Sequence, residues 1–263
     1  MTADAPLAAL RSRLVATAGG YLRNLVTDGT CSRCYTPIAG STMRAPMCSR
    51  CRRDDDTDAA TGLPDARGFM TYASHHEPIA QSGRLMRDYK SPIQPSASAQ
   101  RTIKLLAALA LQGHRDCPRA LVGTAPTAWA VVPSLPPKAP DHHPLARILR
   151  SFARTNSSEI DMCGVGDPES PRDLCAAHFA IRSPIPRRAH VLLIEDTWTS
   201  GGHAQSAALA LRAAGAEHVS LLALARWLTP EWGATTTTWM KNTLSGVDYD
   251  PSVCPWTQSS CPT

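Results

Sequence analysis

A strand, turn, helix and strand in succession between Val191 and Ala225 constrain the fold most strongly. Val191 to Ile194 is a continuous apolar run, and a glycine-containing turn follows it. The next segment places its small and apolar residues on one side of a helix, and Val219 to Ala225 forms a second apolar run. Two buried strands joined by a helix within about 35 residues form a βαβ unit, whose right-handed crossover makes the strands parallel. The pattern therefore predicts an α/β domain with a parallel sheet flanked by helices.

The remaining elements are predicted from apolar spacing and from prolines. The expected elements are an N-terminal helix ending near Gly20, a short strand at 68–72, a helix at 98–112, a buried strand at 128–132 and a helix that begins at Pro144. The segment 155–188 is rich in serine, proline and charge, and only 179–181 has the character of a strand. We expect a long irregular excursion there.

Four of the nine cysteines form two Cys-x2-Cys pairs at the front of the chain. Cys31 and Cys34 are followed, after thirteen residues, by Cys48 and Cys51. Each pair makes a tight turn that directs two thiolates at one ion, and two such turns complete the tetrahedral thiolate set of a structural zinc ribbon. The neighbouring arginines at 33, 50, 52 and 53 offset its negative charge. Four thiols without metal, or two disulfides, remain the alternatives.

The turn between the strand ending at Ile194 and the next helix has the composition of an anion site. Glu195 and Asp196 follow the strand, and the residues from Thr197 to His203 supply hydroxyls, two glycines and a histidine. The N-terminus of the next helix offers unpaired N–H groups and a positive dipole end to a phosphate. Ligands of parallel sheets also bind beyond the carboxyl ends of the strands. An ordinary turn in which a hydroxyl residue caps the helix is the alternative.

The apolar strand, acidic pair and Thr-Ser-Gly-Gly sequence resemble the phosphoribosyl pyrophosphate (PRPP) motif of the type I phosphoribosyltransferases. With the two cysteine pairs in front, the chain resembles the ComF family, over roughly residues 31–228. The resemblance implies a type I phosphoribosyltransferase-like sheet flanked by helices, behind a small N-terminal zinc ribbon. Its predicted organisation is a helix at 1–29, the zinc ribbon at 30–53, a linker at 54–68, the phosphoribosyltransferase-like domain at 69–245 and a tail at 246–263.

The resemblance also assigns roles to residues. Glu195 and Asp196 match the acidic pair that contacts the ribose hydroxyls of PRPP and acts in catalysis, and magnesium accompanies the substrate. The residues matching the loop that binds the 5′-phosphate are Thr197, Thr199, Ser200, Gly201, Gly202 and His203. In the family the position of His203 usually holds a small hydroxyl residue. The pyrophosphate loop, here 133–143, lacks the family's arginine, which leaves Lys138 and Lys90 as the candidate pyrophosphate contacts.

Three functions follow from the resemblance. The chain is expected to bind PRPP with magnesium and to transfer the phosphoribosyl group to an unknown nitrogen acceptor, with release of pyrophosphate. A ComF-like accessory protein of DNA uptake or recombination, which contacts single-stranded DNA or a helicase-like protein, is the alternative from another class. A PRPP sensor without turnover is the third. The net charge of +5 is compatible with phosphate-rich ligands and selects none of the three.

Other residues receive plainer expectations. Cys254 and Cys261 close a tail loop, pack in the tail or bind metal with partners elsewhere, and two cysteines alone make no site. Cys117, Cys163 and Cys175 are expected to be small buried apolar residues, and His143 a surface residue. The apolar runs are far shorter than the roughly 20 residues of a membrane span, and no basic-then-apolar leader is visible, so a cytoplasmic location is expected.

Overall fold

A computed structural model describes residues 4–38, 46–57, 59–135, 143–152, 157–165, 170–232 and 234–263. The chain groups into two compact units. The first comprises Met1–Arg52, Phe69–Arg115 and Leu224–Cys261, and the second comprises Arg53–Gly68, Asp116–Ala223 and Pro262–Thr263.

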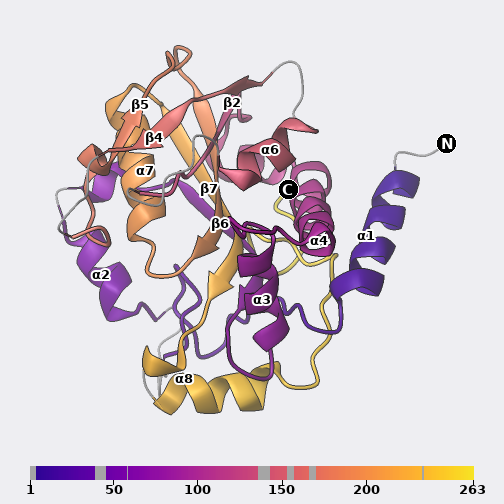
Figure 1. The fold of residues 1–263 in the computed structure, drawn as a ribbon. Coiled ribbons are helices and arrows are strands. Elements are labelled where there is room, and N and C mark those ends of the chain that lie inside the picture. The colour runs from indigo at the N-terminus through magenta and orange to yellow at the C-terminus, as the bar shows by residue number, and fades with distance from the viewer. Residues whose placement is uncertain are drawn as a thin grey trace. The chain divides into compact units, whose positions relative to one another are not determined.

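A five-stranded parallel sheet forms the core, as the βαβ pattern predicted (Figure 1). Its strand order is β1 (Ala66–Ala73), β7 (His218–Trp227), β6 (His190–Trp198), β2 (Ala128–Val131) and β3 (Ser158–Glu159). β2 pairs in parallel with β6, with Val131 opposite Ile194, and in parallel with β3. All four residues of β2 are buried, as expected for a parallel strand covered on both faces.

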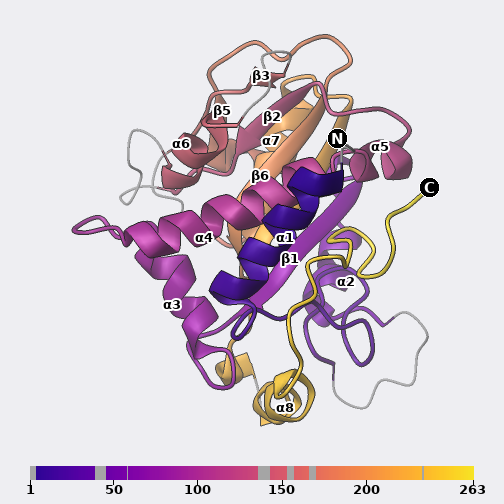
Figure 2. The ribbon, with the colours of Figure 1, turned by 90° about the vertical axis from the view of Figure 1, so that its right-hand side faces the viewer.

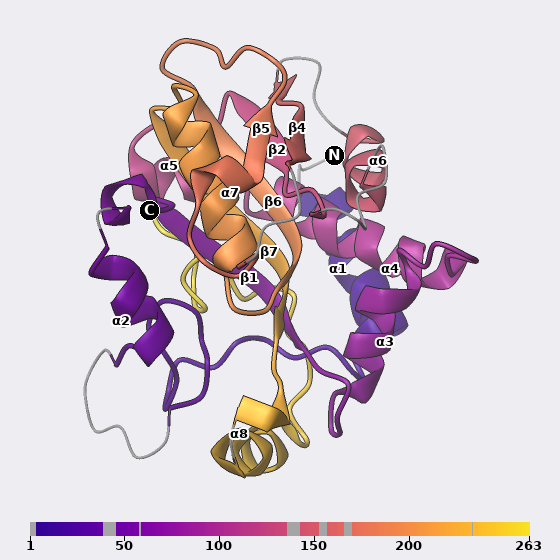
Figure 3. The same ribbon diagram turned by 60° about the vertical axis from the view of Figure 1, so that its left-hand side comes forward.

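Helices of the second unit lie against these strands. α7 (Gly202–Ala213) packs on β6 and on β5 (Phe179–Ile181), and α6 (Pro144–Arg150) packs on β2 (Figure 3). α5 (Cys117–Val122) ends at Gly123, which adopts a left-handed φ of 91°. α6 confirms the helix predicted to begin at Pro144, and α7 confirms the helix predicted between the apolar runs at 191–194 and 219–225.

The segment 155–188 contains more structure than its composition predicted. β3 adds an edge strand to the sheet, and β4 (Met162–Gly164) pairs antiparallel with β5. A single 3-10 turn, Ala176–His178, packs on α7. Strands of two or three residues are too short to produce a readable alternation of apolar and polar side chains, which is why only β5 was anticipated.

The first unit contains a cluster of helices. α1 (Asp4–Ala18) packs on α4 (Ala97–Ala108), and α3 (Ala80–Asp88) packs on α4 as well (Figure 2). Ser96 caps α4 by accepting a hydrogen bond from the N–H of Ala99. The remaining helical segments of both units, within the described residues, are α2 (Ser49–Asp55), α8 (Ala234–Trp239), the π-helical turns Leu109–Gly113 and Met240–Leu244, and the 3-10 turns Ala60–Gly62 and Pro230–Trp232.

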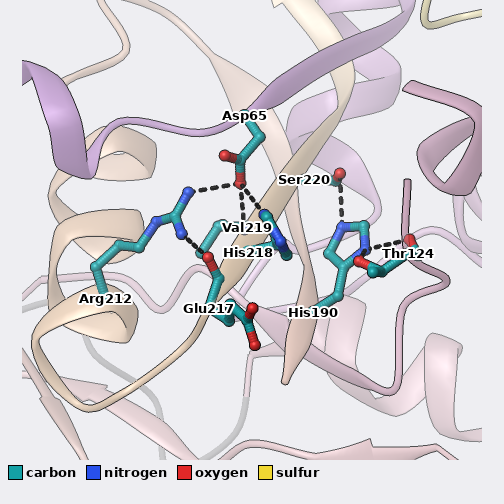
Figure 4. Close-up of polar contacts among 8 residues, drawn as sticks. All are labelled: Asp65, Thr124, His190, Arg212, Glu217, His218, Val219 and Ser220. Carbon is teal, nitrogen blue, oxygen red and sulfur yellow. Dashed lines mark hydrogen bonds and ion pairs between the residues drawn. The ribbon is translucent and has the colours of Figure 1, made fainter. Parts of the chain in front are cut away.

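A polar network joins the amino ends of β6 and β7 within the second unit (Figure 4). Asp65 accepts hydrogen bonds from the N–H of Val219 at 2.8 Å and from Arg212. Burial alone would raise the pKa of Asp65, but these hydrogen bonds and the charges of Arg212 and His218 outweigh burial and lower it. The network fixes the helix-to-strand turn at the edge of the sheet opposite the expected ligand site.

Among the described residues, no helix combines the length and the apolar character that a membrane crossing requires.

Candidate functional site

The acidic pair lies inside β6, because the strand continues to Trp198 rather than ending at Ile194. Both carboxyl side chains are largely buried, with 8% of Glu195 and 7% of Asp196 exposed. Consecutive strand residues point to opposite faces of a sheet. The two carboxylates therefore serve different faces at the carboxyl end of β6.

His143 faces Asp196 from the start of α6. Its Nδ1 accepts a hydrogen bond from the N–H of Leu145 at 3.2 Å and caps the helix, while its Nε2 lies 3.8 Å from Oδ2 of Asp196. Only 9% of the His143 side chain is exposed. The expectation of a surface histidine was therefore wrong. Sequence spacing gave no sign that the cap of α6 meets β6.

The connections of the sheet diverge between β2 and β6. From β2 the chain passes through α6 to β3 on one side, and from β6 it passes through α7 to β7 on the other. In open parallel sheets such a divergence opens a crevice at the carboxyl ends of the two strands. His143 and Asp196 lie on the two sides of this point. Lys138 falls in the loop after β2, outside the described residues.

The turn from β6 into α7 is closely packed around its glycines. Gly201 has a φ of 86°, and a Cβ there would lie 2.2 Å from the indole ring of Trp198. A Cβ on Gly202 would lie 2.1 Å from the carbonyl oxygen of Arg172. Packing therefore requires both glycines, whether or not a ligand approaches them. The other predicted phosphate-loop residues, Thr197, Thr199, Ser200 and His203, are half-buried.

Basic side chains surround the start of α7. Burial lowers the pKa of His203, and the nearby charges of His178 and Arg172 lower it further, although a hydrogen bond to the carbonyl of Pro171 opposes this. His178 is 8% exposed, and its Nδ1 has no hydrogen-bond partner among the described residues. Oγ1 of Thr197 is buried and equally unpartnered within the described chain. Such groups are typical of sites that hold water or a ligand.

Arg172 and His178 were not predicted, because both lie in the segment 155–188, which was expected to be irregular. The 3-10 turn Ala176–His178 and the short strand β5 bring this segment against α7. A pocket beside β2, β3 and α6 is lined by His143, by Pro133 and Ser134 of the predicted pyrophosphate loop, and by the charged side chains of Arg150, Glu159 and Arg182. None of residues 195–203 lines it.

Lys90, the other candidate pyrophosphate contact, follows α3. Its Nζ lies 5.9 Å from the centroid of the Tyr89 ring. Lys90 belongs to the first unit and the acidic pair to the second, so its contact with pyrophosphate stays a prediction.

The four cysteines of the two Cys-x2-Cys pairs meet at one point. One sulfur from each of Cys31, Cys34, Cys48 and Cys51 lies within 4.8 Å of the others, and the group can hold a metal ion. The N–H of Cys48 donates to Sγ of Cys31 at 3.3 Å, and the N–H of Cys51 donates to Sγ of Cys48 at 3.5 Å. An isolated bridge between Thr30 and Pro37 closes the first turn. Backbone donors to sulfur are typical of metal-binding turns.

Arg226 of β7 lies beside this cluster and is 1% exposed. Its guanidinium donates to the carbonyl of Cys34 and to the hydroxyl of Thr36, and one nitrogen lies 3.9 Å from Sγ of Cys34. Hydrogen bonds from Cys31, Cys48 and Cys51, together with the charge of Arg226, hold the pKa of Cys34 well below its usual value. Arg226 is a buried charge partner in addition to the four neighbouring arginines that the sequence predicted for this role.

No model of a known protein family matches the chain, and no curated protein matches it either. Its function is therefore inferred from its own residues.

Proposed function

We propose that the carboxyl end of β6 and the turn into α7 bind PRPP with magnesium, and that the protein transfers the phosphoribosyl group to a nitrogen acceptor. The observation that carries the proposal is the position of Asp196. It lies two residues before the end of the central parallel strand β6, at the divergence of the sheet connections, faces His143 and precedes a helix start near Arg172, His178 and His203. The resemblance to the type I phosphoribosyltransferases and the ComF family supports the same ligand.

In this proposal the carboxylate of Asp196 accepts hydrogen bonds from the ribose hydroxyls, and the carboxylate of Glu195 reaches the same sugar around the carboxyl end of β6 from the other face. They also stabilise the positive charge that develops on the ribosyl carbon when pyrophosphate leaves. The oxygen-rich pyrophosphate and the strand-end carboxylates suit magnesium, which neutralises charge on the departing group when bound. The N–H groups of the first turn of α7 and the charge of Arg172 attract the 5′-phosphate, and the imidazoles of His178 and His203 donate hydrogen bonds to it. The two glycines do not carry the proposal, because packing accounts for them.

Calorimetry with PRPP and magnesium tests the binding step. Asp196→Asn should weaken binding at least tenfold, because a hydrogen bond to a charged group contributes about 1.5–3 kcal/mol. If Asp196 made no contact, removing its negative charge would instead leave the affinity for an anionic ligand equal or higher. Glu217→Gln, which removes an exposed carboxylate near the start of β7, is the matched control and should bind like the unsubstituted protein.

Release of pyrophosphate in the presence of purine bases, pyrimidine bases and simple amines tests the transfer step. Release with one acceptor class, lost in Asp196→Asn, is the expected result. Binding of PRPP without release for any acceptor would favour the sensor or the accessory role. Absence of PRPP binding by the folded protein would reject the proposed ligand.

We also propose that Cys31, Cys34, Cys48 and Cys51 hold a structural zinc ion. Four thiolates fill a tetrahedral coordination shell and leave no position for a reacting water. Cys48→Ser should lose one zinc per chain and lower the thermal stability, as measured by metal analysis and by melting. Cys163→Ser, which removes a cysteine outside the four-cysteine cluster, should change neither.

A further inference from the structure

The loop at 254–261 brings two sulfurs and an imidazole together within the first unit. The Sγ atoms of Cys254 and Cys261 and a ring nitrogen of His114 all lie within 4.8 Å of one another. Sγ of Cys261 lies 3.4 Å from Nδ1 of His114. All three residues belong to the first unit. Local spacing along the chain does not indicate this cluster, because His114 is far from the two cysteines in sequence.

Backbone hydrogen bonds hold the loop that carries Cys254 and Cys261 in place. The N–H of Cys254 donates to the carbonyl of Ser259 at 2.8 Å, and the N–H of Gln258 donates to the carbonyl of Cys254 at 2.8 Å. The loop is also attached to β1, because the side chain of Gln258 donates to the carbonyl of Phe69 at 3.1 Å. The two sulfurs are thus presented by an ordered loop.

The surroundings of Cys254 favour its thiolate. Cys254 is 0% exposed and His114 is 1% exposed. Burial alone would raise the pKa of the Cys254 thiol, but hydrogen bonds from His114 and from the N–H groups of Trp256 and Thr257 outweigh burial and lower it to about 6. The thiolate is the nucleophilic form of cysteine, so Cys254 is activated at neutral pH.

Cys261 differs from Cys254 in its access to solvent. Its side chain is exposed, so a small oxidant reaches its sulfur directly. An accessible sulfur beside an activated thiolate is the arrangement of redox-active cysteine pairs, in which one sulfur is oxidised and the other resolves it. Packing as small apolar side chains would explain Cys254 but not the approach of an exposed thiol to a buried histidine.

We propose that Cys254 and Cys261 form a dithiol that hydrogen peroxide oxidises to a reversible disulfide. The described residues of the first unit bring three ligand atoms to this cluster, whereas a structural zinc site takes four. Oxidation of the pair needs no group from outside the first unit. The site is independent of the proposed PRPP chemistry and of the four-cysteine cluster.

The oxidation takes place in two steps. The sulfur of Cys261 attacks one oxygen of hydrogen peroxide, an S–O bond forms as the O–O bond breaks, and the displaced hydroxide takes the thiol proton and leaves as water. The Cys254 thiolate then attacks the sulfenic sulfur, an S–S bond forms as the S–O bond breaks, and a second water leaves. The two thiols lose two electrons and two protons in total. A small thiol reduces the disulfide again by exchange.

Peptide mapping of the full chain tests the site without any substitution. No lysine or arginine follows Lys241, so trypsin releases one peptide, 242–263, that contains both cysteines. After treatment with equimolar hydrogen peroxide and then an alkylating agent, this peptide should carry no alkyl group and should be two hydrogen atoms lighter than its dithiol form. Dithiothreitol should restore both alkylation sites. Two alkyl groups on the peptide after peroxide treatment would overturn the proposal.

Substitutions separate the roles of the two sulfurs. Cys254→Ser should lose the disulfide and accumulate a sulfenic acid on Cys261, which dimedone traps. Cys163→Ser, which removes a cysteine outside the pair, is the control and should form the disulfide as the unsubstituted protein does. Equal dimedone labelling of Cys261 in Cys254→Ser and in the unsubstituted protein would contradict the resolving role of Cys254.

Metal analysis distinguishes oxidation from metal binding at the same loop. Cys261→Ser and the unsubstituted protein, both purified under reducing conditions, should contain the same amount of zinc. A loss of one zinc per chain in Cys261→Ser would overturn the proposal in favour of a metal site.

Discussion

The imidazole of His143 lies with Nε2 3.8 Å from Oδ2 of Asp196, and 9% of each side chain is exposed. Because Nδ1 of His143 accepts the N–H of Leu145, the neutral ring carries its proton on Nε2, toward the carboxylate. One histidine thus caps α6 and orients the acidic group of β6.

These two roles of His143 can be separated by substitution. His143→Ala should destabilise the protein by about 1 kcal/mol through loss of the helix cap, whereas His143→Asn restores a capping side chain and should recover most of that loss. Both variants remove the group facing Asp196 and should weaken PRPP binding similarly. Urea unfolding and calorimetry measure the two effects. Equal stability of the Ala variant and the unsubstituted protein would contradict the capping role.

Arg226 is expected to support the four-cysteine cluster through its buried charge. Arg226→Met removes hydrogen bonds from a charged donor to the carbonyl of Cys34 and the hydroxyl of Thr36 and should destabilise the protein by about 1.5–3 kcal/mol, the usual contribution of a hydrogen bond that involves a charged group. Zinc affinity, measured by competition with a chromophoric chelator, should fall about 10–100-fold. Arg226→Lys keeps the positive charge but lacks the planar guanidinium. Its zinc affinity should lie between those of the unsubstituted protein and Arg226→Met. Unaltered zinc affinity in Arg226→Met would exclude this role.

The pH dependence of His190 follows from its burial within the polar network of Figure 4. Nδ1 lies 2.7 Å from the carbonyl of Thr124 and Nε2 lies 2.8 Å from Oγ of Ser220. Burial lowers the pKa of His190 below 6.5, although the hydrogen bond to Thr124 opposes the shift.

The unfolded chain therefore binds a proton at His190 more readily than the folded chain does. The stability contributed by the neutral ring is present above pH 6.5 and is lost as the pH falls below that value. NMR titration of the His190 ring should give a midpoint below 6.5. A midpoint at or above 6.5 would contradict the burial argument.

Gly201 and Gly123 form a matched pair for testing the turn before α7. Both have left-handed φ values, 86° and 91°, but a Cβ on Gly201 meets Trp198 whereas a Cβ on Gly123 meets no atom of the described chain within 4 Å. Gly123→Ala should lower the free energy of unfolding by about 1 kcal/mol through backbone strain. Gly201→Ala should lower it by the same amount and by about 1–3 kcal/mol more, because the added methyl group overlaps the ring of Trp198. Thermal or urea unfolding measures the difference. Equal losses of stability in Gly123→Ala and Gly201→Ala would contradict the predicted overlap with Trp198.

Local patterns in the sequence predicted the elements that short-range physics controls. The apolar runs of β2, β6 and β7 and the helical spacing of α7 were recognisable because burial on a regular backbone imposes a period. The two Cys-x2-Cys turns were recognisable for a similar reason, since chelation by adjacent turns requires fixed spacing. The short strands β3 and β4 were missed because two or three residues carry no period.

Tertiary structure alone decided which distant side chains meet. Local spacing does not encode the approach of His143 to Asp196, of Arg226 to Cys34, or of Cys254 and Cys261 to His114. Such contacts depend on how strands and loops are ordered in space, and many chain paths satisfy the same local pattern. The sequence by itself determined a parallel α/β core and a four-thiol cluster, while the folded chain determined the surroundings that tune their chemistry.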